Sequence, residues 1–354
     1  MNAPFATPIS RSAVFDDVEF SDHENVVFVS DRKTGLKAVI AIHDTTLGPS
    51  LGGCRIWPYA NAAEALTDAL RLSRGMTYKN ALAGLDLGGG KAVIIADPRK
   101  DKTPELMEAF GAHVERLSGN YITAEDVGVS TEDMEAVARK TAHVRGTTAT
   151  GLGDPSPYTS LGVFEGIKAA SRHVFGTADL TGRTVSVQGL GHVGFGLCEL
   201  LHAAGAKLLV SDIHVPAVLK AMEAFGATAV DPAEAHMVPA DIFAPCALGG
   251  ILNERTVPQI SARVVAGAAN NQLLTAHDGI ALKDRSILYA PDYAINAGGV
   301  ISIALATPGC QADRVREKTV AIGETLSRIF ERADRERKTP EQIADTMAEE
   351  RLGR

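Results

Sequence analysis

The sequence predicts a two-domain α/β protein, and three features of the 354-residue chain support this prediction. A single hydrophobic core usually stops growing at about 250–300 residues, so a chain of this length is expected to form two domains. The first half mixes β-rich and helical segments around glycine-rich runs. The second half alternates strands with helices, as in a doubly wound parallel sheet. We therefore expect domains at 1–147 and 148–324, and a helix at about 325–354 that is able to pack back on the first domain.

The first half contains a predicted β-hairpin, two predicted helices and a further strand. From Val26 to Ile42, the β-rich runs VVFVS and LKAVIAIH flank the turn-forming sequence DRKTG, which indicates a hairpin. Apolar residues at helical spacing predict a helix over Ala62–Arg74. A strand is expected at Lys91–Ala96, directly after three glycines. Thr103 as N-cap, followed by a proline, predicts a second helix to about Leu117.

The second half begins with the order strand, turn, helix, strand. Thr184–Gln188 is a short β-rich run, Gly189–Gly194 is a glycine-rich turn, Phe195–Ala204 has the pattern of an apolar helix, and Lys207–Ser211 is a second β-rich run. Further apolar runs alternate with helical or loop segments at 241–244, 264–268 and 287–290. This alternation is typical of a parallel sheet with crossover connections.

Composition excludes several classes of protein. The formal net charge of −8 opposes binding to nucleic acid or to anionic membrane surfaces. No run of about 18 apolar residues predicts a membrane-spanning helix, and the N-terminus lacks the apolar core of a secretory signal, so we expect a cytoplasmic protein. The ten histidines and four cysteines show no paired ligand spacing, so no metal site is expected.

The glycine-rich turn of the second half matches the G-x-G-x-x-G fingerprint of dinucleotide-binding Rossmann domains. The match is specific because the motif follows a strand, opens a helix and precedes Asp212, which lies 21 residues after Gly191 at the end of the next strand. An acidic residue there binds the ribose hydroxyls and repels a 2′-phosphate, so NAD is favoured over NADP. The alternative is a structural turn with a solvated aspartate. The residues expected to contact NAD are Gly189, Leu190, Gly191, His192, Val193, Gly194, Asp212 and Ile213.

Two lysines and one aspartate of the first half are candidates for catalysis. Lys79 lies in GMTYKNA, Lys91 in LGGGKAV and Asp126 in YITAEDVG. A lone lysine is usually a solvated surface charge, but these residues occur in glycine-rich, otherwise apolar surroundings. A lysine can anchor an anion or activate water in such a site, and an aspartate can transfer protons.

At these residues the sequence resembles the family of glutamate, leucine, phenylalanine and valine dehydrogenases, most closely its leucine-specific members. The resemblance extends over nearly the whole chain. Its segments, in the order of the family, are LGGCRIW, GMTYKNALAGLDLGGGKAVI, GNYITAEDVG, QGLGHVG, IFAPCALGG, AGAANNQL and ILYAPDYAINAGGV.

The resemblance implies an enzyme that oxidatively deaminates an L-amino acid to the 2-oxo acid and ammonia, reversibly and with NAD. It implies an N-terminal substrate-binding domain, a Rossmann NAD-binding domain, a cleft between them and a homo-oligomer. Lys79 matches the lysine that holds the substrate α-carboxylate, Lys91 the lysine that activates water, and Asp126 the carboxylate that carries protons to and from the substrate nitrogen. Asn270 matches a position near the nicotinamide. The substrate contacts implied besides Lys79 are Leu51, Gly52, Gly53, Met76, Ala124, Asn271, Asn296, Val300 and Ile303.

The substrate side chain is expected to be small, branched and aliphatic. Glutamate-specific members carry a lysine where this chain has Leu51, and a buried carboxylate without a cation is costly, so glutamate should be rejected. Ala124 and Val300 match the leucine type, which favours leucine, valine or isoleucine. Two alternatives remain open: a phenylalanine dehydrogenase, and an NAD-sensing regulator that has lost catalysis. Retention of both lysines and the aspartate argues against the regulator.

Overall fold

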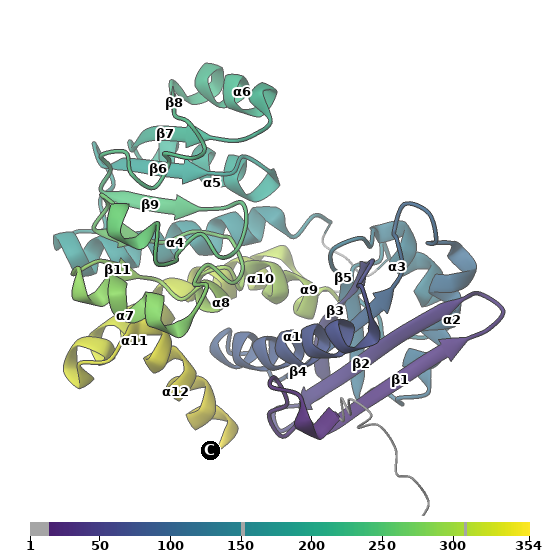
Figure 1. Cartoon of the computed structure of the whole chain (residues 1–354). Coiled ribbons are helices and arrows are strands. Elements are labelled where there is room, and N and C mark those ends of the chain that lie inside the picture. The colour runs from purple at the N-terminus through teal and green to yellow at the C-terminus, as the bar shows by residue number, and fades with distance from the viewer. Residues whose placement is uncertain (1–13, 150–152, 308–309) are drawn as a thin grey trace, which may run out of the picture. The chain divides into compact units, whose positions relative to one another are not determined.

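The computed structural model describes residues 14–149, 153–307 and 310–354 and divides the chain into two compact units (Figure 1). The first unit contains the described residues up to Thr77 together with those from Asp86 to 149, and the second contains 78–85 and the rest of the chain. The predicted two-domain α/β class is confirmed. The boundary between residues 147 and 148 stays a prediction, and parts of both predicted domains lie outside the described residues.

The first unit is built on a five-stranded mixed sheet with the order β1-β2-β4-β3-β5. Strand β2 is antiparallel to both of its neighbours, β1 and β4, whereas β3 is parallel to both β4 and β5. The predicted hairpin is confirmed as β1 and β2, and the strand expected to begin at Lys91 begins three residues earlier. The strands are β1 (Asn25–Asp31), β2 (Leu36–Asp44), β3 (Ser50–Trp57), β4 (Gly88–Ile95) and β5 (Tyr121–Glu125).

Helices cover both faces of this sheet: α1 (Ala62–Leu82) lies on one, and α2 (Pro104–Glu115) and α3 (Thr131–Ala138) lie on the other. Thr103 caps α2 as predicted, because its side chain accepts a hydrogen bond from the Leu106 N–H at 3.2 Å. Helix α1 is longer than the sequence predicted and ends at residue 82 rather than 74, so Met76 and Lys79 lie on a helix.

The second unit contains the predicted doubly wound sheet, which is six-stranded and entirely parallel with the order β11-β10-β9-β6-β7-β8. The chain order reverses between β6 and β9, which is where such sheets bind ligands, beyond the carboxyl ends of the strands. The strands are β6 (Thr184–Gln188), β7 (Lys207–Ser211), β8 (Thr228–Ala229), β9 (Ile242–Pro245), β10 (Val264–Val265) and β11 (Leu288–Tyr289).

Nine α-helices accompany this sheet within the described residues, and α4 packs against α5, α9 and α11. None of the helices described is long and apolar enough to cross a membrane. The helices are α4 (Ser156–Phe175), α5 (His192–Ala203), α6 (Val215–Phe225), α7 (Ala276–Asp284), α8 (Asp292–Ile295), α9 (Gly298–Leu305), α10 (Ala312–Val320), α11 (Ile322–Glu336) and α12 (Pro340–Leu352).

The C-terminal segment differs from the single helix expected at about 325–354. It forms α11 and α12, because Arg337 adopts a left-handed conformation (φ 58°) that ends α11, and Pro340 starts a new helix after Thr339. Helix α12 contacts the last turn of α1: Tyr78 donates a hydrogen bond to Glu349, and Arg351 donates one to the Ala81 carbonyl. These α1 residues belong to the second unit.

Candidate active site

Lys91 and Asp126 form a nearly buried ion pair in the first unit. Lys91 lies on β4 with its side chain 7% exposed, and its Nζ is 2.7 Å from Oδ2 of Asp126, the first residue after β5. Strand β3 lies between β4 and β5, so the pair crosses over β3. The structure thus brings together the two residues that the sequence marked for catalysis in this unit.

Gly53 on β3 provides the space for this crossing. A Cβ atom at Gly53 would lie 2.8 Å from the Cβ of Asp126 and 2.6 Å from the Glu125 carbonyl oxygen. The neighbouring Gly52 has a different reason to be glycine, because a Cβ there would lie 1.6 Å from the Gly90 carbonyl oxygen of β4. One glycine therefore makes room for the ion pair, and the other permits close packing of the two strands.

The pocket residues predicted for this unit share the face of the sheet that carries the ion pair. Leu51 is in register with Gly89, two residues before Lys91, and Ala124 is in register with Gly53. Because side chains alternate along a strand, Leu51, Ala124 and Lys91 point to the same side. Leu51 and Ala124 are buried, and Met76 is half-buried on α1.

Arg55, which the sequence analysis missed, is a second cation at Asp126. Its Nε lies 3.0 Å from Asp126 Oδ2, and its Nη1 lies 2.9 Å from Asp68, which also accepts a hydrogen bond from Tyr59. The sequence contains a signal for this contact once β3 is recognised as a strand. Side chains alternate along a strand, so Arg55 lies on the same face as Gly53 and Leu51.

These two cations determine the protonation state of the carboxylate. Burial raises the pKa of Asp126, but Lys91 and Arg55 outweigh burial and lower the pKa to about 2. Asp126 is therefore ionised at neutral pH and is able to accept a proton.

In the second unit, Lys79 belongs to a polar cluster with two asparagines. Lys79 Nζ donates a hydrogen bond to Asn270 Oδ1 at 3.3 Å, and Asn296 Nδ2 donates to the same oxygen at 2.8 Å. Asn296 is buried, and its Oδ1 has no hydrogen-bond partner within the described part of the chain. Asn271, the residue after Asn270, adopts a left-handed conformation (φ 52°). The cluster thus offers a cation and a buried amide oxygen to a polar ligand.

Val300 and Ile303 lie one turn apart on α9 of the second unit, and both are half-buried. The predicted pocket residues are therefore distributed over both units, with Leu51, Met76 and Ala124 in the first.

The glycine-rich turn joins β6 to α5 and fits the pyrophosphate of a dinucleotide. Gly189 adopts φ +98°, and a Cβ there would lie 2.8 Å from the Ala247 nitrogen. A Cβ on Gly194 would lie 1.9 Å from the Gly189 carbonyl oxygen, so this glycine permits the close turn. In contrast, a Cβ on Gly191 would meet no atom of the described part of the chain within 4 Å, which leaves open space at the N-terminus of α5. Backbone N–H groups and the helix dipole favour an anion there.

Asp212 lies directly after β7 and contacts the same turn. It accepts a hydrogen bond from the Leu190 N–H at 2.6 Å and another from the His214 N–H at 2.7 Å. The next residue, Ile213, is 92% exposed, and His192 is also exposed. The structure therefore brings the predicted acidic residue to the glycine-rich turn, as a dinucleotide site requires.

Comparison with known proteins identifies the family. Residues 23–143 match the family described as Glu/Leu/Phe/Val dehydrogenase, dimerisation domain, and residues 213–333 match Glutamate/Leucine/Phenylalanine/Valine dehydrogenase. A leucine dehydrogenase from Geobacillus stearothermophilus is 51% identical over 341 residues, which cover 96% of this chain and 93% of the relative. A valine dehydrogenase from Streptomyces albus is 50% identical over 337 residues, which cover 93% and 92%.

A solved structure agrees with this assignment. The L-tryptophan dehydrogenase from Nostoc punctiforme is 45% identical and superposes with a TM-score of 0.84, covering 94% of this chain and 96% of that chain. With both of its halves matched by the family and about half of its residues shared with individual members, the chain belongs to the Glu/Leu/Phe/Val dehydrogenase family.

Proposed function

We propose that this chain catalyses the reversible NAD-dependent oxidative deamination of a branched aliphatic L-amino acid, namely leucine, valine or isoleucine. The observation that carries the proposal is the ion pair of Lys91 and Asp126, 2.7 Å apart, nearly buried and made possible by Gly53. The similarity to relatives named leucine and valine dehydrogenase supports the substrate class. In the overall reaction, the amino acid, NAD⁺ and water give the 2-oxo acid, ammonium, NADH and one proton.

Lys79, Asn270 and Asn296 bind the polar end of the substrate and the nearby cofactor. The ammonium of Lys79 attracts the α-carboxylate, and the buried Oδ1 of Asn296 accepts a hydrogen bond from the substrate amino group. A buried oxygen without a partner favours a ligand that can donate to it, because an unmade hydrogen bond is costly.

The Gly189–Gly194 turn and Asp212 bind the dinucleotide, and Asp212 favours NAD over NADP. NAD bound to these residues would supply the acceptor for a hydride from the substrate Cα.

Lys91 and Asp126 carry out the proton transfers. The amine of Lys91 orients and activates the water that adds to the oxidised carbon, while the ionised Asp126 accepts a proton from the substrate nitrogen and later returns one to the departing ammonia. Arg55 holds Asp126 in position through its Nε. In the direction of reductive amination, the same groups act in reverse.

The chain is also proposed to form a homo-oligomer in the cytoplasm. Residues 23–143 match a region described as a dimerisation domain, and this match supports the oligomer. Light scattering of the purified protein measures its molar mass in solution and so tests the proposed homo-oligomer.

A panel of amino acids tests the substrate assignment. Initial rates of NADH formation are measured with L-leucine, L-valine, L-isoleucine, L-phenylalanine and L-glutamate, and the best substrate is repeated with NADP. A branched aliphatic substrate is expected to be preferred with NAD, because Leu51 offers no cation to glutamate and is buried. A preference for phenylalanine would retain the chemistry and refute the proposed side-chain specificity.

Replacement of Gly191 by alanine is expected to weaken NADH binding by about tenfold or more, because its Cβ would occupy the space of the pyrophosphate. The free energy of unfolding should change by less than about 1 kcal/mol, since that Cβ meets no atom of the described residues within 4 Å. Fluorescence titration with NADH measures the first effect. The control is Gly75→Ala on α1. The Cβ of this variant also meets no atom within 4 Å among the residues that the structure describes, and NADH affinity should be unchanged.

Replacement of Arg55 by glutamine is expected to lower kcat by about tenfold or more, the equivalent of one charge-assisted hydrogen bond, with little change in KM for the amino acid. Arg55→Lys should restore part of the loss. Arg71→Gln is the matched control, because Arg71 contacts Asp68 but not Asp126. Equal effects of Arg55→Gln and Arg71→Gln on kcat would show that Arg55 acts only through the stability of the fold.

Replacement of Gly53 by alanine is expected to lower kcat by about a hundredfold, because the new Cβ would displace Asp126 from Lys91. Gly111→Ala provides the comparison, since its Cβ would lie 2.6 Å from the Val137 carbonyl oxygen, away from the site. That variant should lose stability but keep the kcat of its folded fraction. If Gly53→Ala turned over normally, the account of this glycine would be wrong.

A further inference from the structure

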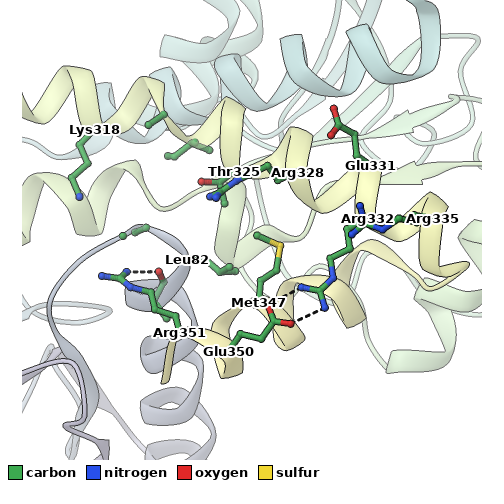
Figure 2. A pocket seen from close by; sticks show the side chains of 15 residues that line it. Leu82, Lys318, Thr325, Arg328, Glu331, Arg332, Arg335, Met347, Glu350 and Arg351 are labelled. Atoms are coloured by element: carbon green, nitrogen blue, oxygen red, sulfur yellow. Dashed lines mark hydrogen bonds and ion pairs between the residues drawn. The ribbon is translucent and has the colours of Figure 1, made fainter. Parts of the chain in front are cut away.

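A groove of about 730 Å³ lies within the second unit, apart from the residues assigned above (Figure 2). It is formed by the end of α1 with the turn that follows, and by helices α10, α11 and α12. Its apolar lining includes Leu82, Ile322 and Met347. A volume of this size is suited to a small organic ligand.

The groove is strongly basic although the chain as a whole has a net charge of −8. Five basic residues line it against two acidic ones, Glu331 and Glu350. Glu350 is already neutralised, because both of its oxygens accept hydrogen bonds from Arg332 at 2.7 and 2.8 Å. The five basic residues are Lys318, Arg328, Arg332, Arg335 and Arg351.

Three of these cations form no ion pair within the described residues, although Glu331 lines the same groove. Within residues 14–149, 153–307 and 310–354, Lys318, Arg328 and Arg335 make no hydrogen bond or ion pair. Like charges gathered without a partner repel one another, and a bound anion would relieve this repulsion.

Two of the cations converge over one glycine. Gly84 adopts a left-handed conformation (φ +67°), and a Cβ there would lie 3.4 Å from Lys318 Nζ and 3.9 Å from Arg351 Nη1. Arg351 is held in place, because its Nη1 donates a hydrogen bond to the Ala81 carbonyl at 2.6 Å. Lys318 and Arg351 are both half-buried residues.

We propose that this groove binds a phosphate-bearing small molecule of about nucleotide size, with phosphate oxygens between Lys318 and Arg351 and the remainder against the apolar lining. Arginine forks and lysine amines match phosphate oxygens, and Arg328 and Arg335 add two further cations to the lining of the groove. Occupancy would join α10 and α12 to the last turn of α1. A second copy of the chain is a weaker candidate, because all five cations lie outside the residues matched as a dimerisation domain.

Isothermal titration with inorganic pyrophosphate, in the presence of saturating NADH, tests the proposal. NADH fills the glycine-rich turn, so heat that persists reports another site. The expected result is one site per chain, weakened about tenfold or more by Lys318→Ala and by Arg328→Ala. Arg316→Ala is the control, since Arg316 is exposed on α10 but does not line the groove, and it should bind normally.

Amide hydrogen exchange locates the bound anion. Pyrophosphate should slow exchange in residues 78–85 and in α10, and sodium chloride at equal ionic strength should not. The proposal is overturned if NADH abolishes the heat, if Arg316→Ala weakens binding as much as Lys318→Ala, or if succinate binds as tightly as pyrophosphate. It is also overturned if Lys318→Ala dissociates the oligomer without changing pyrophosphate affinity, which would assign the groove to a second copy.

Discussion

Replacement of Lys91 by alanine is expected to lower kcat for L-leucine oxidation by about a thousandfold, the usual contribution of a positioned proton-transfer group. The methyl group of alanine cannot orient water, and among the described residues Asp126 would keep Arg55 as its remaining cationic partner. Steady-state rates at saturating leucine and NAD measure the effect, and circular dichroism checks the fold.

A matched lysine provides the control for this variant. Lys102 pairs with Asp133 at 2.5 Å in the same unit, and its side chain is 22% exposed. Lys102→Ala removes a comparable ion pair away from the site, so it should lower stability but leave kcat within about twofold of wild type. A Lys91→Ala variant with kcat near that of wild type would refute the role of Lys91.

Replacement of Asp126 by asparagine is expected to lower kcat by about a thousandfold as well, because the amide has a similar shape but cannot carry the proton. The variant should also unfold more easily at neutral pH, since Lys91 and Arg55 lose their shared counter-charge in a nearly buried site. Rates and urea unfolding measure the two effects separately. Unchanged turnover would exclude Asp126 from the proton transfers.

The pH dependence of stability tests the same carboxylate independently. Burial raises the pKa of Asp126, but Lys91 and Arg55 lower it from 3.8 to about 2. The ionised pair therefore stabilises the fold above about pH 4, by about 2 kcal/mol, and this stabilisation is lost as the pH falls towards 2. The difference in unfolding free energy between wild type and Asp126→Asn should shrink over this range and stay constant above it.

The second unit was largely predictable from the sequence because each of its elements has a local signal. The strands at 184–188 and 207–211 and the glycine-rich turn occur as expected, and the helix between them begins at His192 rather than at Phe195. Close contacts with the described residues require glycine at Gly189 and Gly194. Short-range chemistry determines such a turn, since backbone conformation and close approach depend on neighbouring residues.

The first unit was less predictable, because strand β3 does not have the composition of a strand. Gly52, Gly53 and Arg55 occur in β3, although glycine is unfavourable in strands and usually indicates a turn. The contacts that require these glycines come from β4 and from Asp126, which are distant in sequence. A local pattern therefore could not reveal β3, and without β3 the contact of Arg55 with Asp126 was not visible.

The C-terminal end of helix α1 also depends on contacts with residues that are distant in sequence. The apolar pattern predicts a helix only to Arg74, and the residues that follow include the poor helix formers Gly75, Thr77 and Tyr78. Packing extends the helix: Thr77 lies against Gly89 of β4, where a Cβ would be 2.1 Å from the Thr77 nitrogen. The sequence identified Lys79 as a site residue through the family resemblance, whereas its position on a helix came only from the structure.

The product balance with L-leucine tests the central claim most directly. The purified protein is incubated with L-leucine and NAD, and NADH, ammonia and 4-methyl-2-oxopentanoate are each quantified over time. Our account predicts that the three products form in equal amounts, and that supplying the 2-oxo acid, ammonia and NADH reverses the reaction. Binding of NAD without formation of any of these products would contradict it, and would identify the chain as a regulator that retains the fold without the chemistry.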